Sequence, residues 1–209
     1  MPPNLRFYPH FFILASLAIA LFSVTASIYT YLRGPGVGVE GNPLLDPAPA
    51  YTVNRLMFPL TVNSTVGPIR VPVDGKINII TPQYTRCPDI CHLETAVMVY
   101  VMRVLEDRGY RDAVVWVTID VDPWSSSMSS VEAYMASKAR ALAERGSWIW
   151  VLDDEGTLRQ LWSQLGIRAE RDPKTGLVAH TAGFIIVDDR GYIRYHVNPR
   201  DWSNVKAIA

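Results

Sequence analysis

The sequence predicts an α/β domain with a mostly parallel central sheet, preceded by one long apolar segment. From about residue 51, short strand-like runs alternate with stretches of helical periodicity. Apolar residues make up 49% of the 209 residues, which is enough to build a packed core. Residues 11–29 contain no charged side chain, which sets them apart from the rest of the chain.

This apolar segment is long enough to span a bilayer, which requires roughly 20 residues. Tyr8 and Tyr31 near its two ends suit an interfacial aromatic belt. We therefore expect residues 1–32 to form a single-pass membrane anchor. The alternative is a cleaved signal peptide, for which residues 24–26 (Val-Thr-Ala) offer a small-residue cleavage site. Both alternatives place the following domain on the extracytoplasmic side of the cell membrane.

Residues 33–50, RGPGVGVEGNPLLDPAPA, are rich in glycine and proline and have no periodicity. Proline removes backbone donors and glycine resists ordering, so we expect a linker between the membrane and the domain. The soluble domain is then expected to occupy residues 51–209.

The elements expected in this domain alternate between strands and helices. A hairpin is expected at residues 57–62 and 69–73, followed by a buried strand at 76–80. Next come a helix at 88–108, a strand at 114–119, a helix from the serines at 125–130 to about 144, a strand at 148–152, a short helix at 157–165 ending at Gly166, and a closing hairpin at 183–187 and 192–196. This order, with cysteines between the first central strand and the first long helix, predicts a thioredoxin-like fold with an N-terminal hairpin.

The only two cysteines, Cys87 and Cys91, lie four residues apart at the expected start of a helix. A disulfide between them would close a very small loop and give little chain-entropy stabilisation, so their role is more chemical than structural. Residues four apart share a helical face, and helix N-terminal amides favour a thiolate. Two converging thiolates bind soft ions such as Cu(I) or Zn²⁺. The same pair is also a candidate redox-active dithiol.

Histidine is the obvious third ligand for such a site, and the chain has four. His10 lies beside the apolar segment, and His92, next to Cys91, would point about 100° away on a helix. His196 lies in the last expected strand. His180 lies in an expected loop just before a strand, where a ligand can approach a cysteine turn, so we favour His180.

The sequence around these residues resembles the Sco/SenC family of copper chaperones. Residues 84–91, YTRCPDIC, match the family pattern aromatic-Thr-x-Cys-Pro-Asp-x-Cys throughout. Residues 117–123 resemble its strand ending in Asp-Pro, residues 178–181 resemble the loop that carries its copper histidine, and the similarity covers about residues 52–197. Three departures stand out: Ala179 where the family often has Asp, His92 where it often has Pro, and Pro82-Gln83 where it usually has Phe-Gly.

The resemblance implies a cytochrome c oxidase assembly protein that binds Cu(I) or Cu(II) through Cys87, Cys91 and His180. It implies that the protein delivers copper to the binuclear copper centre of cytochrome c oxidase, or prepares cysteines there. The partner would be the copper-bearing subunit of that enzyme or another cuproprotein. Such a metallochaperone is a binding protein without turnover.

Two enzymatic alternatives use the same cysteines. A thiol–disulfide oxidoreductase acting on extracytoplasmic cysteines would normally have two residues between its own cysteines, whereas this chain has three. A peroxidase of the peroxiredoxin type would need a different loop signature. Zinc also accepts this ligand set. The formal net charge is zero, with 20 basic and 20 acidic residues and no long basic run, which argues against a nucleic-acid partner.

Overall fold

The structure, a computed structural model, describes residues 50–197. All of them belong to one compact unit of the chain. The predicted anchor, residues 1–32, lies outside the described residues, as does the predicted linker except for its last residue. Within residues 50–197, no helix combines the length and the apolar character needed to cross a membrane.

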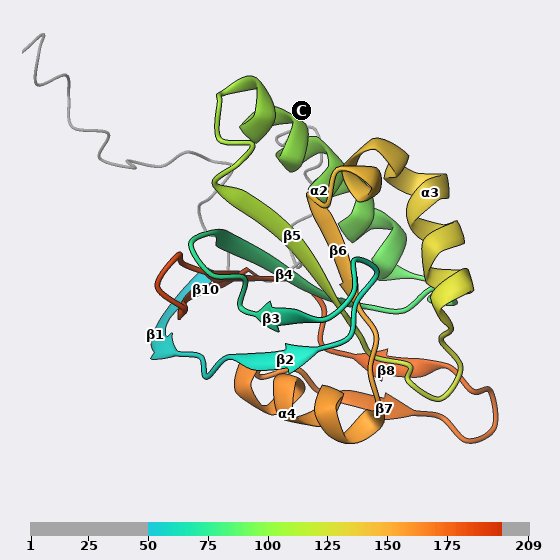
Figure 1. Ribbon diagram of the computed structural model, residues 1–209. Helices are drawn as coiled ribbons and strands as arrows, with labels where there is room; N and C mark the ends of the chain where they lie inside the picture. Colours follow the sequence, from blue (N-terminus) through green and yellow to red (C-terminus); the bar gives the residue numbers. More distant parts are fainter. Residues whose placement is uncertain (1–49, 198–209) are drawn as a thin grey trace, which may run out of the picture. The chain divides into compact units, whose positions relative to one another are not determined.

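A six-stranded sheet forms the centre of the domain (Figure 1). Its strands, in spatial order, are β1 (Ala50–Leu56), β10 (Tyr192–Val197), β9 (Phe184–Val187), β4 (Ile77–Gln83), β5 (Val114–Asp120) and β6 (Trp148–Val151). The pairs β4–β5 and β5–β6 are parallel, and the other three neighbouring pairs are antiparallel. The sheet is therefore mixed rather than mostly parallel: the predicted closing hairpin, β9 and β10, adds antiparallel strands, and β1 adds an antiparallel edge strand that the sequence did not predict.

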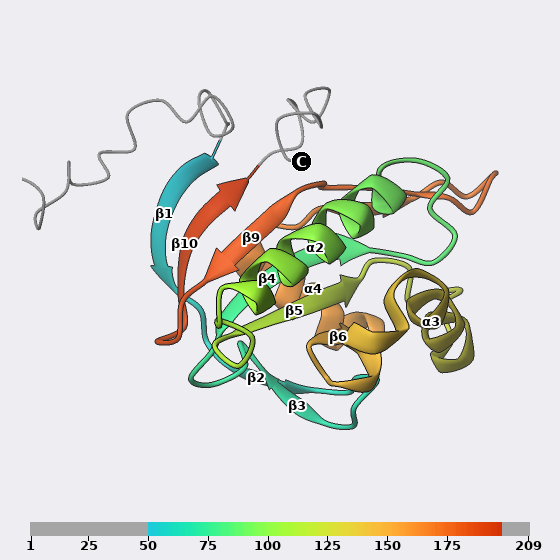
Figure 2. The same cartoon turned by 90° about the horizontal axis from the view of Figure 1, so that it is seen from above.

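Helices cover both faces of this sheet. Helices α2 (Ile90–Asp107) and α3 (Met128–Glu144) share one apolar cluster with one face, and Figure 2 shows α2 in front of the central strands. Helix α4 (Glu155–Leu165) packs on the other face together with β2 (Leu60–Val62) and β3 (Ile69–Val71). The strands β2 and β3 are antiparallel, which confirms the predicted N-terminal hairpin.

Strand β5 lies in the middle of these layers, and all seven of its residues are buried. Val115, Val117 and Ile119 belong to the cluster formed with α4, whereas Val114 and Trp116 belong to the cluster formed with α2 and α3. Successive strand residues point to opposite faces, so a strand covered on both sides reads as a continuous apolar run. This explains why the segment was recognisable as a buried strand.

Two tryptophans donate hydrogen bonds to buried threonine hydroxyls in the layer between the sheet and helices α2 and α3. Trp116 and Trp148 stack across β5 and β6 with ring centroids 4.0 Å apart. Their indole N–H groups donate to the hydroxyls of Thr81 at 2.8 Å and Thr118 at 2.9 Å. Buried hydroxyls are costly unless paired, so these bonds let threonine occur inside the sheet.

The helix ends follow the predicted signals. Ser127 caps α3 by accepting a hydrogen bond from the amide of Ser130, within the expected run of serines. Gly166 ends α4 in the left-handed conformation, with φ of 71°, that glycine adopts without steric cost. Strands β7 (Ala169–Arg171) and β8 (Val178–His180), an antiparallel pair, were not predicted, because three residues are too few to show a strand period.

Strand pairing brings three chain segments to one edge of the sheet. Strands β4 and β5 run parallel and end there, at Gln83 and Asp120. Strand β9 runs antiparallel to β4, with Ile185 opposite Ile80, so it begins at the same edge. The cysteine turn after β4 and the residues just before β9 are therefore neighbours.

We expect Leu161→Ala to lower the free energy of unfolding by about 2–5 kcal/mol, because truncating a fully buried leucine leaves a cavity. Leu161 in α4 is fully buried, whereas Leu56 in β1 is 45% exposed. Leu56→Ala is therefore the matched control, with an expected loss below about 1 kcal/mol. Urea denaturation measures both, and equal losses would contradict the packing of α4 on the sheet.

Candidate metal centre

The cysteine turn connects the end of β4 to the start of α2. The amide of Cys87 donates to the carbonyl of Tyr84 at 3.3 Å, which closes the turn. Helix α2 begins at Ile90, so Cys91 is its second residue and Cys87 precedes it. The expectation that both cysteines share a helical face is therefore wrong. Their sulfurs still converge, because the turn folds Cys87 back onto the helix start.

The sulfur of Cys87 takes the place of a helix cap. Asp89 occupies the N-cap position of α2, but its side chain makes no capping hydrogen bond. The backbone amides of Asp89 and Cys91 instead interact with the Cys87 sulfur and lower its pKa. Unsatisfied amides at a helix N-terminus stabilise negative charge, so this position favours a thiolate.

The two cysteines share one proton unequally. A hydrogen bond from the side chain of Cys91 lowers the pKa of Cys87 most, burial opposes this, and His180 lowers it further. The pKa of Cys91 is raised by its hydrogen bond to Cys87, by burial and by the charge of Cys87. The pair therefore holds a thiolate at Cys87 and a thiol at Cys91 near neutral pH.

His180 is the last residue of β8, not a loop residue as predicted. Its Nε2 atom lies 3.5 Å from the sulfur of Cys91, and its Nδ1 atom lies 2.7 Å from the carbonyl oxygen of Thr181. A carbonyl oxygen can only accept, so Nδ1 carries a proton and donates it to Thr181. Nε2 is the nitrogen that faces the sulfurs. Burial lowers the pKa of His180, but its bonds to Cys87 and Thr181 and the charge of Glu94 outweigh this and raise it.

These three side chains fit a single soft cation. Their ligand atoms all lie within 4.8 Å of one another, and no other group of metal-binding side chains occurs within residues 50–197. Donors around one ion at about 2.0–2.3 Å are roughly 3–4 Å apart, so only a small inward movement is needed. Two sulfurs and one imidazole are ligands for copper or zinc rather than for hard cations.

A buried carboxylate supports the centre from behind. Glu94 accepts a 2.6 Å hydrogen bond from the amide of Gly183 and a 3.2 Å bond from the amide group of Gln83, which also donates to the carbonyl of Cys91. Burial raises the pKa of Glu94 to about 7, against the effect of these donors. Glu94 thus ties the cysteine helix to the segment that follows His180. The sequence analysis missed it, although its place one helical turn after Cys91 was a usable signal.

The remaining histidines stay apart from this group. His92 is exposed and stacks on Tyr134 with ring centroids 6.2 Å apart. His196 lies on β10, opposite Ile185 of β9. His10 lies outside the described residues. Of the histidines within residues 50–197, His180 alone joins the cysteines.

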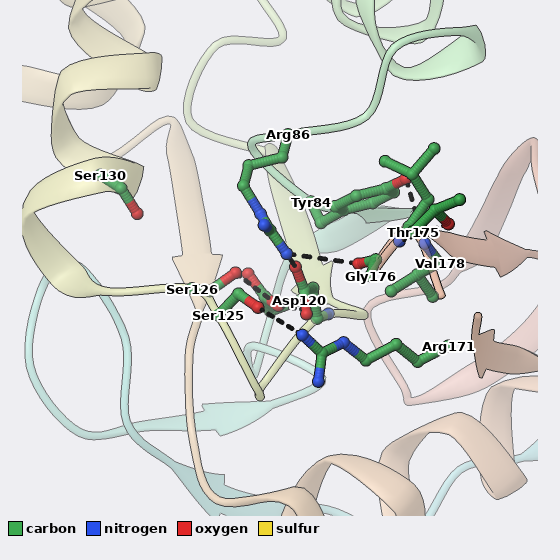
Figure 3. Close-up of polar contacts among 12 residues, drawn as sticks. Tyr84, Arg86, Asp120, Ser125, Ser126, Ser130, Arg171, Thr175, Gly176 and Val178 are labelled. Carbon is green, nitrogen blue, oxygen red and sulfur yellow. Dashed lines mark hydrogen bonds and ion pairs between the residues drawn. The ribbon is translucent and has the colours of Figure 1, made fainter. Parts of the chain in front are cut away.

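In front of the cysteines, Arg86 forms an ion pair with Asp122 (2.7 Å). Asp122 follows β5, and its carbonyl accepts from the amides of Ser125 and Ser126, which forms the turn between β5 and α3. Its side chain is 1% exposed, whereas that of Arg86 is 49% exposed. Figure 3 shows Arg86 extending from the cysteine turn toward Gly176.

An open groove of about 650 Å³ runs beside His180. Its walls come from α4 and from the β7–β8 hairpin, and they include Arg159, Trp162, Ala179 and Thr181. His180 is half-buried, whereas Cys91 is fully buried and Cys87 is 5% exposed. Among the three candidate ligands, His180 is therefore the one that solvent reaches most easily.

Comparison with protein families identifies the chain. The family model described as SCO1/SenC matches residues 69–209, which is more than half of the sequence. The chain belongs to the SCO1/SenC family. No curated protein matches the sequence.

Solved Sco structures share the fold of this SCO1/SenC protein. Bradyrhizobium japonicum ScoI with copper bound is 21% identical, with 67% of this chain and 88% of that chain covered and a TM-score of 0.58. Yeast Sco1 with copper bound is 18% identical, with 73% and 84% covered and a TM-score of 0.58. BsSco, described by its disulfide switch, is 16% identical, with 76% and 95% covered and a TM-score of 0.59. These matches confirm the predicted thioredoxin-like α/β fold.

We expect iodoacetamide to alkylate Cys87 faster than Cys91 in the metal-free protein, with a rate that changes little between pH 6 and pH 8. The lowered pKa of Cys87 keeps it a thiolate well below the ordinary thiol value of about 8.5. His180→Ala should raise that pKa, so the pH at which alkylation reaches half of its maximal rate should move upward. Mass spectrometry of the modified peptides measures the rates. A rate that rises about tenfold per pH unit up to pH 8 would show that Cys87 is an ordinary thiol.

Proposed function

We propose that this protein binds one copper ion, Cu(I) or Cu(II), through Cys87, Cys91 and His180, and transfers it to another protein. The observation that carries the proposal is the convergence of two sulfurs and one imidazole nitrogen within 4.8 Å. Membership of the SCO1/SenC family and the copper-bound structures of its similar proteins support copper as the metal.

The number of donors favours copper over zinc. Structural zinc sites have four protein ligands, and catalytic zinc sites have three plus a water in a cavity. The group here has three ligands within the described residues, and both sulfurs are buried. A three-coordinate site dominated by thiolates suits Cu(I), and the imidazole adds a ligand that also suits Cu(II).

Each ligand contributes differently to copper capture. Cys87 is already a thiolate and offers the first bond without losing a proton. Cys91 must release its proton, because its pKa is raised and only the thiolate form of cysteine binds a metal ion. Nε2 of His180 completes the set, with the ring oriented by the bond from Nδ1–H to Thr181. Copper uptake therefore releases protons.

The acceptor that we propose is the copper-bearing subunit of cytochrome c oxidase, at its binuclear copper centre, or another cuproprotein. BsSco, which has a similar fold, is described as a member of the Sco family of cytochrome c oxidase assembly proteins. The groove beside His180 offers room for an acceptor segment. Ala179 forms part of its wall, so the departure from the family's aspartate changes the surface that an acceptor meets.

Thiol–disulfide exchange is the second candidate function. The lowered pKa of Cys87 and the adjacent thiol of Cys91 form a nucleophile and a resolving thiol, as exchange requires. The disulfide switch described for BsSco supports this alternative. Reduction of an acceptor's cysteines would oxidise Cys87 and Cys91 to a disulfide and transfer two electrons. Such exchange does not require His180 as a ligand.

We expect the reduced domain, residues 45–209, to bind one copper per chain. His180→Ala should weaken Cu(II) binding more than Cu(I) binding, because two thiolates alone still suit Cu(I). Either Cys→Ser variant should weaken both. The matched control is His92→Ala, because His92 is exposed and lies outside the cluster. Competition titrations with chelators specific for each oxidation state measure the affinities.

The same variants separate the two functions. If His180→Ala leaves both the Cu(II) affinity and the Cu(II) spectrum unchanged, the three-ligand site is wrong. If it leaves exchange with a disulfide peptide intact while each Cys→Ser variant abolishes exchange, the cysteines also act as a redox pair.

We further propose that residues 1–32 anchor the chain in the cell membrane and that the domain lies on the extracytoplasmic side. The charge-free segment 11–29 supports this assignment. The full chain should remain in the membrane fraction after an alkaline carbonate wash, whereas a chain beginning at residue 45 should not. Intact mass distinguishes the alternative, because signal cleavage near residue 26 would remove the segment from the mature protein.

A further inference from the structure

The β7–β8 hairpin is joined to the cysteine turn by two hydrogen bonds, and Val178 of β8 belongs to the same buried apolar cluster as Cys87 and Cys91. The amide of Val178 donates to the hydroxyl of Tyr84 at 3.3 Å, and Nη2 of Arg86 donates to the carbonyl of Gly176 at 3.4 Å. Cys91 is fully buried and Cys87 is 5% exposed. A ligand from another protein can therefore reach a metal between the sulfurs only after a segment packed against them moves, and the β7–β8 hairpin is one such segment.

The two ends of this segment are held with unequal strength. Behind His180, the amide of Gly183 makes a buried 2.6 Å bond to the carboxylate of Glu94. At the tip, residues 171–178, the hydrogen bonds to the rest of the domain are longer, at 3.3–3.4 Å, and two of these three bonds are exposed. Short bonds to a buried charge are stronger than long exposed ones, so the tip separates before the base does.

Arg86 is the residue that holds the tip from the side of the cysteine turn. Its guanidinium is fixed by the 2.7 Å ion pair with Asp122, a carboxylate that is 1% exposed. Arg86 is the one ion-pair partner of Asp122 within residues 50–197, and the other carboxylate oxygen, Oδ1, has no hydrogen-bond partner there. A guanidinium presents several donors in one plane, so a single side chain can serve both Asp122 and the carbonyl of Gly176.

The backbone of the tip at Gly176 lies close to two arginine side chains. Gly176 has a φ of 70°, which favours glycine, and a Cβ at this position would lie 3.4 Å from Nη2 of Arg171. Arg171 in turn donates to the hydroxyl of Ser125 at 3.4 Å (Figure 3). Gly176 therefore lies between two arginines, one from the cysteine turn and one from its own hairpin.

We propose that Arg86 is a positioning residue that holds the tip of the β7–β8 hairpin against the cysteine turn and thereby sets the rate at which copper leaves the site. The effect of Arg86 on copper release rests on the proposed copper-binding function. Its effect on the position of the hairpin tip does not depend on copper. Arg86 ligates nothing itself. It acts through Asp122 on one side and through Gly176 on the other.

The test compares Arg86→Gln with Arg168→Gln, and the first measurement uses the metal-free protein. The side chain of Arg168, also an exposed arginine beside His180, makes no hydrogen bond or ion pair within the described part of the chain. In Arg86→Gln, hydrogen exchange of the Val178 amide should accelerate about 3–10-fold, the effect of losing one long, exposed hydrogen bond of ordinary strength. Exchange of the Gly183 amide should not change, and Arg168→Gln should change neither.

The second measurement uses the copper-loaded protein. Release of Cu(I) to an excess of a chelator should accelerate by the same factor of about 3–10 in Arg86→Gln and not in Arg168→Gln. The Cu(II) spectrum should stay unchanged, because all three ligands remain. A purely structural role would instead lower stability and alter the spectrum.

The proposal is overturned if Val178 exchanges equally fast in wild type and Arg86→Gln, if Arg168→Gln matches Arg86→Gln, or if exchange accelerates while copper release does not. Should Arg86→Gln fail to fold, Arg86→Lys replaces it, because lysine keeps the charge opposite Asp122 but lacks the planar fork. A smaller acceleration of hydrogen exchange at the Val178 amide is then expected. If Arg86→Lys causes no acceleration at all, the proposal is overturned. If the wild type binds no copper, the proposed function fails, and exchange alone decides whether Arg86 holds the tip.

Discussion

The antiparallel pairing of β9 with β4 is the constraint on which the candidate metal centre depends. Ile185 lies opposite Ile80, so the chain entering β9 passes the point where β4 gives way to the cysteine turn. His180 and Cys91 are 89 residues apart in sequence, yet this pairing leaves their side chains 3.5 Å apart. A shift of one residue in this register would turn the entering strand over and move His180 away from the sulfurs.

Electrostatics then makes this location suitable for a cation. The start of α2 supplies amides to the Cys87 sulfur, and Glu94 places a second ionisable group behind the site. Glu94 takes part in no ion pair within residues 50–197, and it receives only neutral amide donors. A buried site rich in acidic groups and poor in fixed positive charge is stabilised when a metal ion enters.

Sequence patterns predicted most of the fold and all three candidate ligands. Periodicity located the long helices and the buried strands, because β5 is buried along its whole length and α2 keeps its apolar residues at helical spacing over 18 residues. It could not locate β7 and β8, because three residues carry no period, and it missed β1, which follows a stretch rich in proline. The histidine was inferred from its place before a strand and from the family resemblance. Spacing after Cys91 could have indicated Glu94, but its bond to Gly183 and the contacts of Arg86 with Asp122 and Gly176 join distant segments, which spacing along the chain does not reveal.

The central claim, that Cys87, Cys91 and His180 bind one copper ion together, can be tested directly by X-ray absorption spectroscopy of the copper-loaded domain. We expect the Cu(II) form to show two sulfur scatterers and one imidazole nitrogen around each copper, with the imidazole signal lost in His180→Ala. A copper environment of nitrogen and oxygen atoms without sulfur, or an imidazole signal that persists in His180→Ala, would contradict the account.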